Sequence, residues 1–167
     1  PLVVSCQWVE DMRAGLPELP DARRDRYVDQ YGLPDYDATH LTASKATADF
    51  FEAVVREGGT RDKKKRARAA GNWMLGEVTR LLNASGRGIE QTLLIPRHLS
   101  ELLDILDAGT LSNSMVKEVL EEVFSSGEPP GTVVKARGLS QITDASAIEA
   151  AAQQAIDTND AAVADYM

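Results

Sequence analysis

The chain has 167 residues, a formal net charge of −8 at pH 7, 43% hydrophobic residues and 26% charged residues. This balance is typical of a folded globular protein and argues against an intrinsically disordered chain. No apolar run approaches the roughly 18 residues of a membrane span, and the single Cys6 cannot form an internal disulfide. We therefore expect a cytoplasmic protein. Because the sequence starts at Pro1 without a methionine, we also expect a piece of a longer protein.

The first part of the chain predicts two helices. One covers residues 22–31, with Pro20 near its first turn and Gly32 placed to end it in a left-handed conformation. The second has Thr42 as its N-cap, apolar residues at helical spacing, and a stop at Gly58. This stop separates the second helix from a basic run, RDKKKRAR, that follows it.

A third helix should take in part of the basic run, continue through Trp73 and end near Gly86. Its apolar residues form a single stripe. We expect Trp73 in the core beside that stripe. Arg80 should lie near the edge of the stripe, and Arg66 or Lys65 should be free for solvent.

Two short amphipathic helices come next. The first starts at Pro96 and ends before Gly109, and the second starts after Ser112 and ends at Gly127. Because the connection between them is short, they should pack as an antiparallel hairpin.

The rest of the chain also has helical character. One or two turns are expected at residues 130–137, another helix at residues 148–156, and a last one after Asn159. The only β-branched triplet, residues 132–134, is too short to build a sheet. The sequence therefore predicts an all-α fold, a bundle of short amphipathic helices.

The charge reverses in the middle of the chain. Residues 61–99 carry nine basic residues against three acidic ones, a balance of +6, whereas residues 1–60 sum to −5 and residues 100–167 to −9. An acidic protein that concentrates its cations in one place offers a surface to a polyanion. Six basic side chains are the candidate phosphate contacts: Lys63, Lys64, Lys65, Arg66, Arg68 and Arg80.

A solvated helix start is the competing interpretation of this basic run, and it is common for runs of charge. The acidity of both flanks argues against it, since a purely solubilising surface should share the charge of its neighbours. We expect contact with phosphate rather than reading of bases, because no aromatic side chains are interleaved with the cations to stack on bases.

Signatures of catalysis and of metal binding are missing from the sequence. His40 and His98 are far from each other and from Cys6, so no spacing resembles a zinc site. Residues 71–76 have the GxxxxG spacing of a phosphate loop, but the Lys and the Ser or Thr that must follow are replaced by Glu and Val. We therefore expect no catalytic, metal or cofactor site in this chain.

Three segments carry a resemblance to a known family: LPELPDARRDRYVDQYGLPDYDA, LTASKATADFFEAVV and GNWMLGEVTRLLNASG. The resemblance continues through LLDILDAGTLSNSMVKEVLEEVFSSGEPPGTVV and RGLSQITD, and so covers essentially the whole chain in order. The chain is similar to the C-terminal half of GatB, one of the three subunits of the tRNA-dependent amidotransferase GatCAB. Such a collinear series is more specific than any single motif.

The resemblance implies two domains. Residues 1–141 would form a helical domain, with an N-terminal connector at 1–36 and a helical core at 37–141. Residues 142–167 would begin a truncated tail domain related to YqeY proteins. The domain that holds ATP and Mg²⁺ in the family, called the cradle, would lie outside this sequence.

The resemblance also implies a role. The parent enzyme is an ATP- and glutamine-dependent ligase that converts misacylated Glu-tRNA(Gln), Asp-tRNA(Asn) or both, and the sequence does not decide between these substrates. This portion would bind and position tRNA without a catalytic centre, and the GatA and GatC subunits would be its partners.

Two features depart from the family pattern. The run RDKKKRAR is more basic than usual, so its role rests on charge alone. Ile95 stands where a capping Ser or Thr is common, which should weaken the helix start at Pro96 by about 1 kcal/mol. Two alternatives stay open: a purely structural brace in the complex, with the cations paired to acidic residues, and a stand-alone YqeY-like module.

Overall fold

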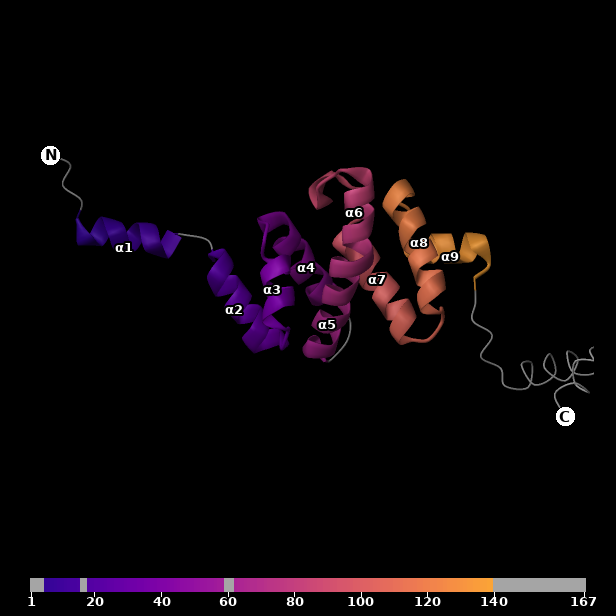
Figure 1. Ribbon diagram of the computed structural model, residues 1–167, viewed down its shortest axis with the longest axis horizontal. Coiled ribbons are helices and arrows are strands. Elements are labelled where there is room, and N and C mark those ends of the chain that lie inside the picture. The colour runs from indigo at the N-terminus through magenta and orange to yellow at the C-terminus, as the bar shows by residue number, and fades with distance from the viewer. Residues whose placement is uncertain (1–4, 16–17, 59–61, 140–167) are drawn as a thin grey trace, which may run out of the picture.

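The computed structural model describes residues 5–15, 18–58 and 62–139, and every regular element in these ranges is helical. The predicted all-α fold is therefore confirmed. Helix α1 (Cys6–Gly15) lies apart from the other helices, which pack into a bundle (Figure 1). On α1, Trp8, Val9 and Met12 are exposed, and the sequence did not lead us to expect this helix.

Helices α2 (Pro20–Tyr31) and α3 (Asp35–Leu41) begin the bundle. Helix α2 ends as predicted, because Gly32 has a φ of 64°, a left-handed conformation that favours glycine. Helix α3 was not predicted, since it is only seven residues long and shows less than two turns of apolar spacing.

The predicted N-cap of helix α4 (Lys45–Glu57) was wrong. The Ser44 hydroxyl caps the helix by accepting a hydrogen bond from the backbone N–H of Thr47 at 3.1 Å. Thr42 is instead buried at the end of α3, where its hydroxyl donates to the Ala38 carbonyl at 2.8 Å. Both residues are good caps by composition, and the unpredicted helix α3 decides which of them is used.

The third predicted helix is confirmed as one continuous stretch with a π-helical segment inside it. It consists of α5 (Lys63–Trp73), the π segment η1 (Met74–Val78) and α6 (Thr79–Ser85), and it ends at Gly86 with a φ of 65°. The Thr79 hydroxyl donates to the Met74 carbonyl at 2.7 Å, which helps to satisfy the backbone where the helix widens. Trp73 is buried, as predicted.

A short 3₁₀ turn η2 (Ile89–Gln91) leads to α7 (Pro96–Asp107), α8 (Asn113–Ser126) and α9 (Pro130–Arg137). The Ser112 hydroxyl caps α8, and Gly127 ends it with a φ of 75°, as predicted. Helices α7 and α8 contact each other as the predicted hairpin. Ile95 supplies no side-chain cap to α7, in agreement with the sequence.

The core runs through the bundle from α2 to α9, and α4 packs mainly against α7 (Figure 1). The rings of Tyr27 and Phe51 meet at 4.9 Å. The largest fully buried side chains are Tyr27, Leu41, Phe51, Val54, Val78, Leu99, Leu102, Leu111, Val116, Val119, Leu120 and Val123. At about 25 cal/mol per Å² of apolar surface, such a core supplies most of the folding free energy.

Two predictions fall outside the described residues. These are the domain boundary after residue 141 and the helices expected beyond it. Within the described ranges, no helix has the length and apolarity to cross a membrane.

Candidate nucleic-acid interface

Helix α5 begins with several basic residues, at a position where the helix dipole disfavours positive charge. Asp62 caps the helix by accepting hydrogen bonds from the backbone N–H groups of Lys64 and Lys65, both at 3.0 Å. Lys63 and Lys64 follow the cap and are exposed. Because the N-terminus of a helix carries a partial positive charge, cations there cost stability, whereas an anion is attracted both by them and by the helix.

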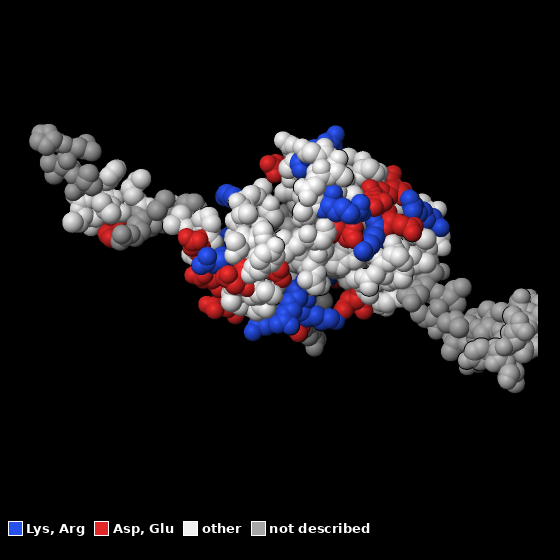
Figure 2. Space-filling model, viewed as in Figure 1, with Lys and Arg blue, Asp and Glu red and all other residues white. Residues whose placement is uncertain are grey.

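The exposed cations form a patch at the start of α5, visible as a blue area at the lower edge of the bundle (Figure 2). Arg68 lies one turn beyond Lys64, is exposed, and donates to the Gly32 carbonyl at 3.4 Å. Among the residues that the structure describes, Lys63, Lys64 and Arg68 form no ion pair. We call these three residues the α5 patch.

Lys65 and Arg66 take a different role, because they join α5 to α7. Lys65 pairs with Asp107. Arg66 is only 3% exposed; its guanidinium donates to Asp104 at 2.7 Å and to the backbone and hydroxyl oxygens of Ser100, both at 2.5 Å. The expectation that Arg66 is free for solvent was therefore wrong, and the expectation for Lys65 holds only in part, because its exposed side chain is paired.

The burial of Arg66 also explains why residue 58 is a glycine. A Cβ atom on Gly58 would overlap Arg66 Nε and lie 2.9 Å from Cζ. In the described part of the chain, this buried Nε has no hydrogen-bond partner. Gly58 is thus required for the space that it leaves beside the guanidinium, although its φ of −65° is open to any residue.

Arg80 lies in a mixed network of acidic and basic side chains. Its guanidinium donates to Glu77 at 2.8 Å and to Glu121 at 2.5 Å, and Glu77 also pairs with Lys117 at 2.6 Å. The positive charge of Arg80 is therefore neutralised by two carboxylates. The structure does not bring Arg80 into the α5 patch.

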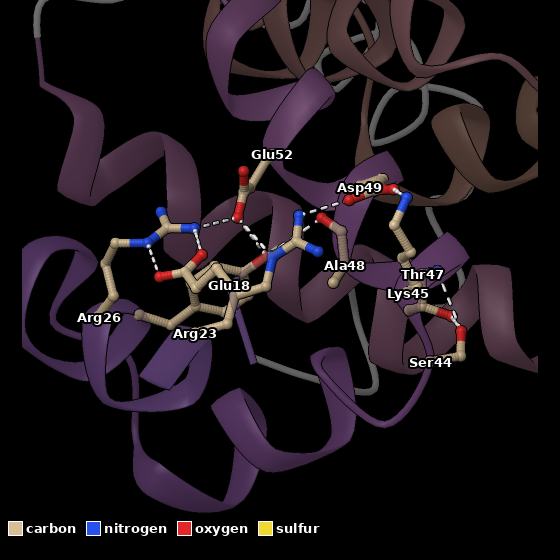
Figure 3. A network of polar contacts seen from close by, with 10 residues as sticks. Glu18, Arg23, Arg26, Ser44, Lys45, Thr47, Ala48, Asp49 and Glu52 are labelled. Atoms are coloured by element: carbon tan, nitrogen blue, oxygen red, sulfur yellow. Dashed lines mark hydrogen bonds and ion pairs between the residues drawn. The ribbon is translucent and has the colours of Figure 1, made fainter. Parts of the chain in front are cut away.

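A second network holds α2 against α4 (Figure 3). Glu52 accepts hydrogen bonds from Arg23 at 2.7 Å, Arg26 at 2.5 Å and the Tyr27 hydroxyl at 2.9 Å. Burial opposes the ionisation of Glu52, but these hydrogen bonds outweigh it and lower the pKa of the carboxyl. Arg26 also pairs with Glu18, and so ties the segment before α2 to the bundle.

Neither a phosphate loop nor a metal centre is found in the part of the chain that the structure describes. Gly71 and Gly76 lie inside the continuous helix, where the backbone N–H groups are used by the helix itself. No group of three or more His, Cys, Asp or Glu side chains is placed to hold a metal ion in the described ranges.

Comparison with known proteins shows the family to which the chain is similar. Residues 49–167 match the family described as GatB domain. The chain belongs to the GatB family. It is 44% identical over 166 residues to the GatB subunit of the aspartyl/glutamyl-tRNA(Asn/Gln) amidotransferase from Carboxydothermus hydrogenoformans, covering 99% of this chain and 33% of that protein. The subunit of the same name from Caldicellulosiruptor bescii is 42% identical over 169 residues, covering 99% of this chain and 34% of that protein.

A relative from a third genus matches over the same extent. The GatB protein from Bacillus pumilus is 39% identical over 165 residues, which again is 99% of this chain and 33% of the relative. The chain thus spans about a third of the length of the curated GatB proteins that it matches. The GatB relatives are subunits of an amidotransferase, so this family forms part of an enzyme complex.

Proposed function

We propose that this chain binds tRNA for an aspartyl/glutamyl-tRNA amidotransferase and that the α5 patch contacts the tRNA backbone. The observation that carries the proposal is the set of three cations at a helix start, Lys63, Lys64 and Arg68, exposed and without carboxylate partners in the described residues of an acidic protein. Lys and Arg that neutralise phosphates release counterions, which gives salt-dependent binding without reading of sequence. We infer that the polyanion is tRNA, because the names of the relatives include tRNA.

The wider assignment follows from the family. We propose that the full protein is the GatB subunit of a cytoplasmic ligase that also contains GatA and GatC, and that it amidates Glu-tRNA(Gln), Asp-tRNA(Asn) or both. We assign ATP, Mg²⁺ and the catalytic centre to another domain of the full protein, as the family resemblance implies. This chain would position tRNA.

A structural brace is the second candidate function, and specific contacts favour it for three of the six predicted residues. Lys65, Arg66 and Arg80 pair with acidic residues inside this chain, although the side chains of Lys65 and Arg80 remain exposed. The two functions therefore divide the basic residues between them. The α5 patch is the part that a brace does not explain.

The test is a salt series on tRNA binding by the full amidotransferase complex. Changing Lys63, Lys64 and Arg68 together to Ala should reduce the slope of log K against log salt concentration by about 2 to 3, since about one counterion is released per lost phosphate contact. The matched control changes three other exposed lysines to Ala, Lys45, Lys117 and Lys135, for the same loss of charge. Equal slopes for the two triple variants would reject the phosphate contact.

A further inference from the structure

A groove of about 400 Å³ opens between α3, the start of α4, and the helical stretch from η1 into α6. Its walls combine the aromatic side chains of Tyr36 and His40 with apolar side chains such as Leu75, Leu82 and Ile89. The π segment forms one wall, and π segments occur often at functional sites.

Tyr36 gives this groove an aromatic surface that faces solvent. Tyr36 is 72% exposed, although its ring meets the His40 ring edge-on with 4.4 Å between the ring centroids. The contact with His40 limits the positions of the ring, and most of the residue remains exposed. An open and positioned aromatic ring is the usual platform on which proteins stack unpaired bases.

Two segments of the chain lead from the α5 patch to the lining of the groove. Arg68 contacts the carbonyl of Gly32, in the turn that leads into α3 and hence to Tyr36. Along the helix itself, Leu75 lies two turns beyond Arg68. The cations of the α5 patch thus lie on chain segments that continue into the walls of an apolar groove.

A further cation lies close in sequence to the lining of the groove. Arg87 is exposed and lies two residues before Ile89, which lines the groove. Cations on the segments that adjoin the groove, together with its apolar and aromatic lining, complement a single splayed nucleotide, whose phosphates are charged and whose base is flat and apolar on its faces.

We propose that this groove receives one unpaired base of the tRNA while the neighbouring phosphates contact the α5 patch. The inference rests on the proposed tRNA-binding function and adds a base-stacking site to it. Asp37 also lines the groove, and its carboxylate can accept a hydrogen bond from an exocyclic amino group.

The sequence alone pointed away from such a site, because no aromatic residue is interleaved with the basic run. The fold supplies the aromatic residue from elsewhere, since α3 brings Tyr36 to a groove whose opposite wall is formed by η1 and α6, 38 or more residues along the chain. A second groove, of about 410 Å³ beside Leu19, does not share this character, because Glu18 and Asp49 line it and are paired with arginines.

The test measures tRNA affinity and its salt dependence for the full complex carrying Tyr36→Ala. Loss of one stacked base should weaken binding about tenfold at fixed salt and leave the salt slope unchanged. Tyr36→Phe should bind within about twofold of the natural protein, since the ring face remains. Leu19→Ala, at a side chain 59% exposed on the second groove, is the control and should not change binding.

The outcomes separate this inference from the proposed function. If the triple variant of the α5 patch weakens binding while Tyr36→Ala binds as tightly as the natural protein, the stacking site is rejected and the phosphate contact stands. If neither variant changes binding, the proposed function itself fails. If Tyr36→Ala prevents assembly of the complex in the absence of tRNA, as seen by size-exclusion chromatography, the groove holds a protein segment and the inference is overturned.

Chemical footprinting gives a second readout that does not depend on affinity. With saturating complex, one unpaired tRNA nucleotide should be protected from base-specific modification by the natural protein and by Tyr36→Phe, and should become reactive with Tyr36→Ala. Because Tyr36 is largely exposed, the Ala variant should melt at the same temperature as the natural protein. Protection that is unchanged in Tyr36→Ala would reject base stacking.

Discussion

Arg66 shows how a residue of the basic run can serve the fold. Replacing Arg66 with Ala should lower the free energy of unfolding of the 167-residue chain by about 3 kcal/mol, because it removes charge-assisted hydrogen bonds to Ser100 and Asp104 and leaves buried oxygens unpaired. Urea unfolding followed by circular dichroism measures this change. The control is Lys63→Ala on the exposed side of α5, which should shift stability by no more than about 0.5 kcal/mol. An equally mild effect of both changes would contradict the buried role of Arg66.

Gly58 and Arg66 should be energetically coupled, because the Arg66 guanidinium occupies the space that a side chain at position 58 would need. Gly58→Ala should cost about 1 to 3 kcal/mol by forcing the guanidinium to move. In an Arg66→Ala background the same change should cost almost nothing. A double-mutant cycle in urea measures the coupling, and strictly additive costs would show that Gly58 has another role.

The burial of Arg66 has a weak sequence signal that the charge of the run hides. Arg66, Ala70 and Trp73 recur at helical spacing, so they lie on one face of α5, and that face is buried. Trp73 could be placed in the core because its apolar character agrees with the stripe. Arg66 could not be placed there, because its partners Ser100 and Asp104 are 34 and 38 residues away and only the packing of α5 on α7 brings them close.

At the scale of the helix, the two lysines at the start of α5 should lower the stability of the helix relative to acidic residues at the same positions. Lys63→Glu with Lys64→Glu should raise the free energy of unfolding by about 1 kcal/mol, since carboxylates favour a helix N-terminus and lysines oppose it. The same pair should weaken tRNA binding by the full complex. The control is Lys135→Glu in the last turn of α9, where the sign is reversed and stability should fall slightly.

Thermal unfolding at low salt measures both changes. A lower melting temperature for the Lys63→Glu, Lys64→Glu protein would mean that the lysines stabilise the helix, and would remove the argument that they are kept for an anion. A gain in stability with a loss of binding is the trade-off expected of a functional surface.

The elements themselves were predictable to different degrees. Glycines and proline mark the ends of α2, α7 and α8, and these ends agree with the sequence because the signals are local. The π segment was not predictable, because the sequence does not show whether a helix keeps its α-helical hydrogen bonds or widens. Here it widens, and the Thr79 hydroxyl donates to the Met74 carbonyl. The predicted N-cap of α4 was wrong for a similar reason, because Ser44 and Thr42 are both favourable caps and only the position of α3 decides between them.

At the scale of the whole molecule, only part of the reversed charge forms a surface of unpaired cations, and the predicted contact with phosphate stays a prediction. Of the six predicted contacts, the fold leaves Lys63, Lys64 and Arg68 free of carboxylates in the described residues and neutralises the others across helix interfaces. Sequence spacing could not show this, because the acidic partners on α7 and α8 come from other parts of the chain. For the same reason the groove at Tyr36 had no signal in the sequence.

The network between α2 and α4 makes stability depend on pH. The pKa of Glu18 is lowered by its hydrogen bond to Arg26, and the pKa of Glu52 is lowered because its hydrogen bonds to Arg23 and Arg26 outweigh the effect of burial. A carboxylate whose pKa is lower in the folded state stabilises the fold above its unfolded pKa, and this contribution is lost as the pH falls through the folded value. The free energy of unfolding should therefore fall steadily as the pH is taken from about 5 to 3.

Glu52→Gln isolates this contribution, because the amide keeps the shape of the carboxyl and cannot ionise. The variant should be less stable than the natural chain at pH 7, since the two arginines lose their shared carboxylate, and its stability should depend less on pH between about 5 and 3. Urea titrations at several pH values measure both effects. The control is Glu128→Gln, an exposed residue whose carboxylate forms no ion pair among the described residues, and its curve should run parallel to that of the natural chain. A Glu52→Gln curve that is also parallel would show that the acid sensitivity arises outside the contact between α2 and α4.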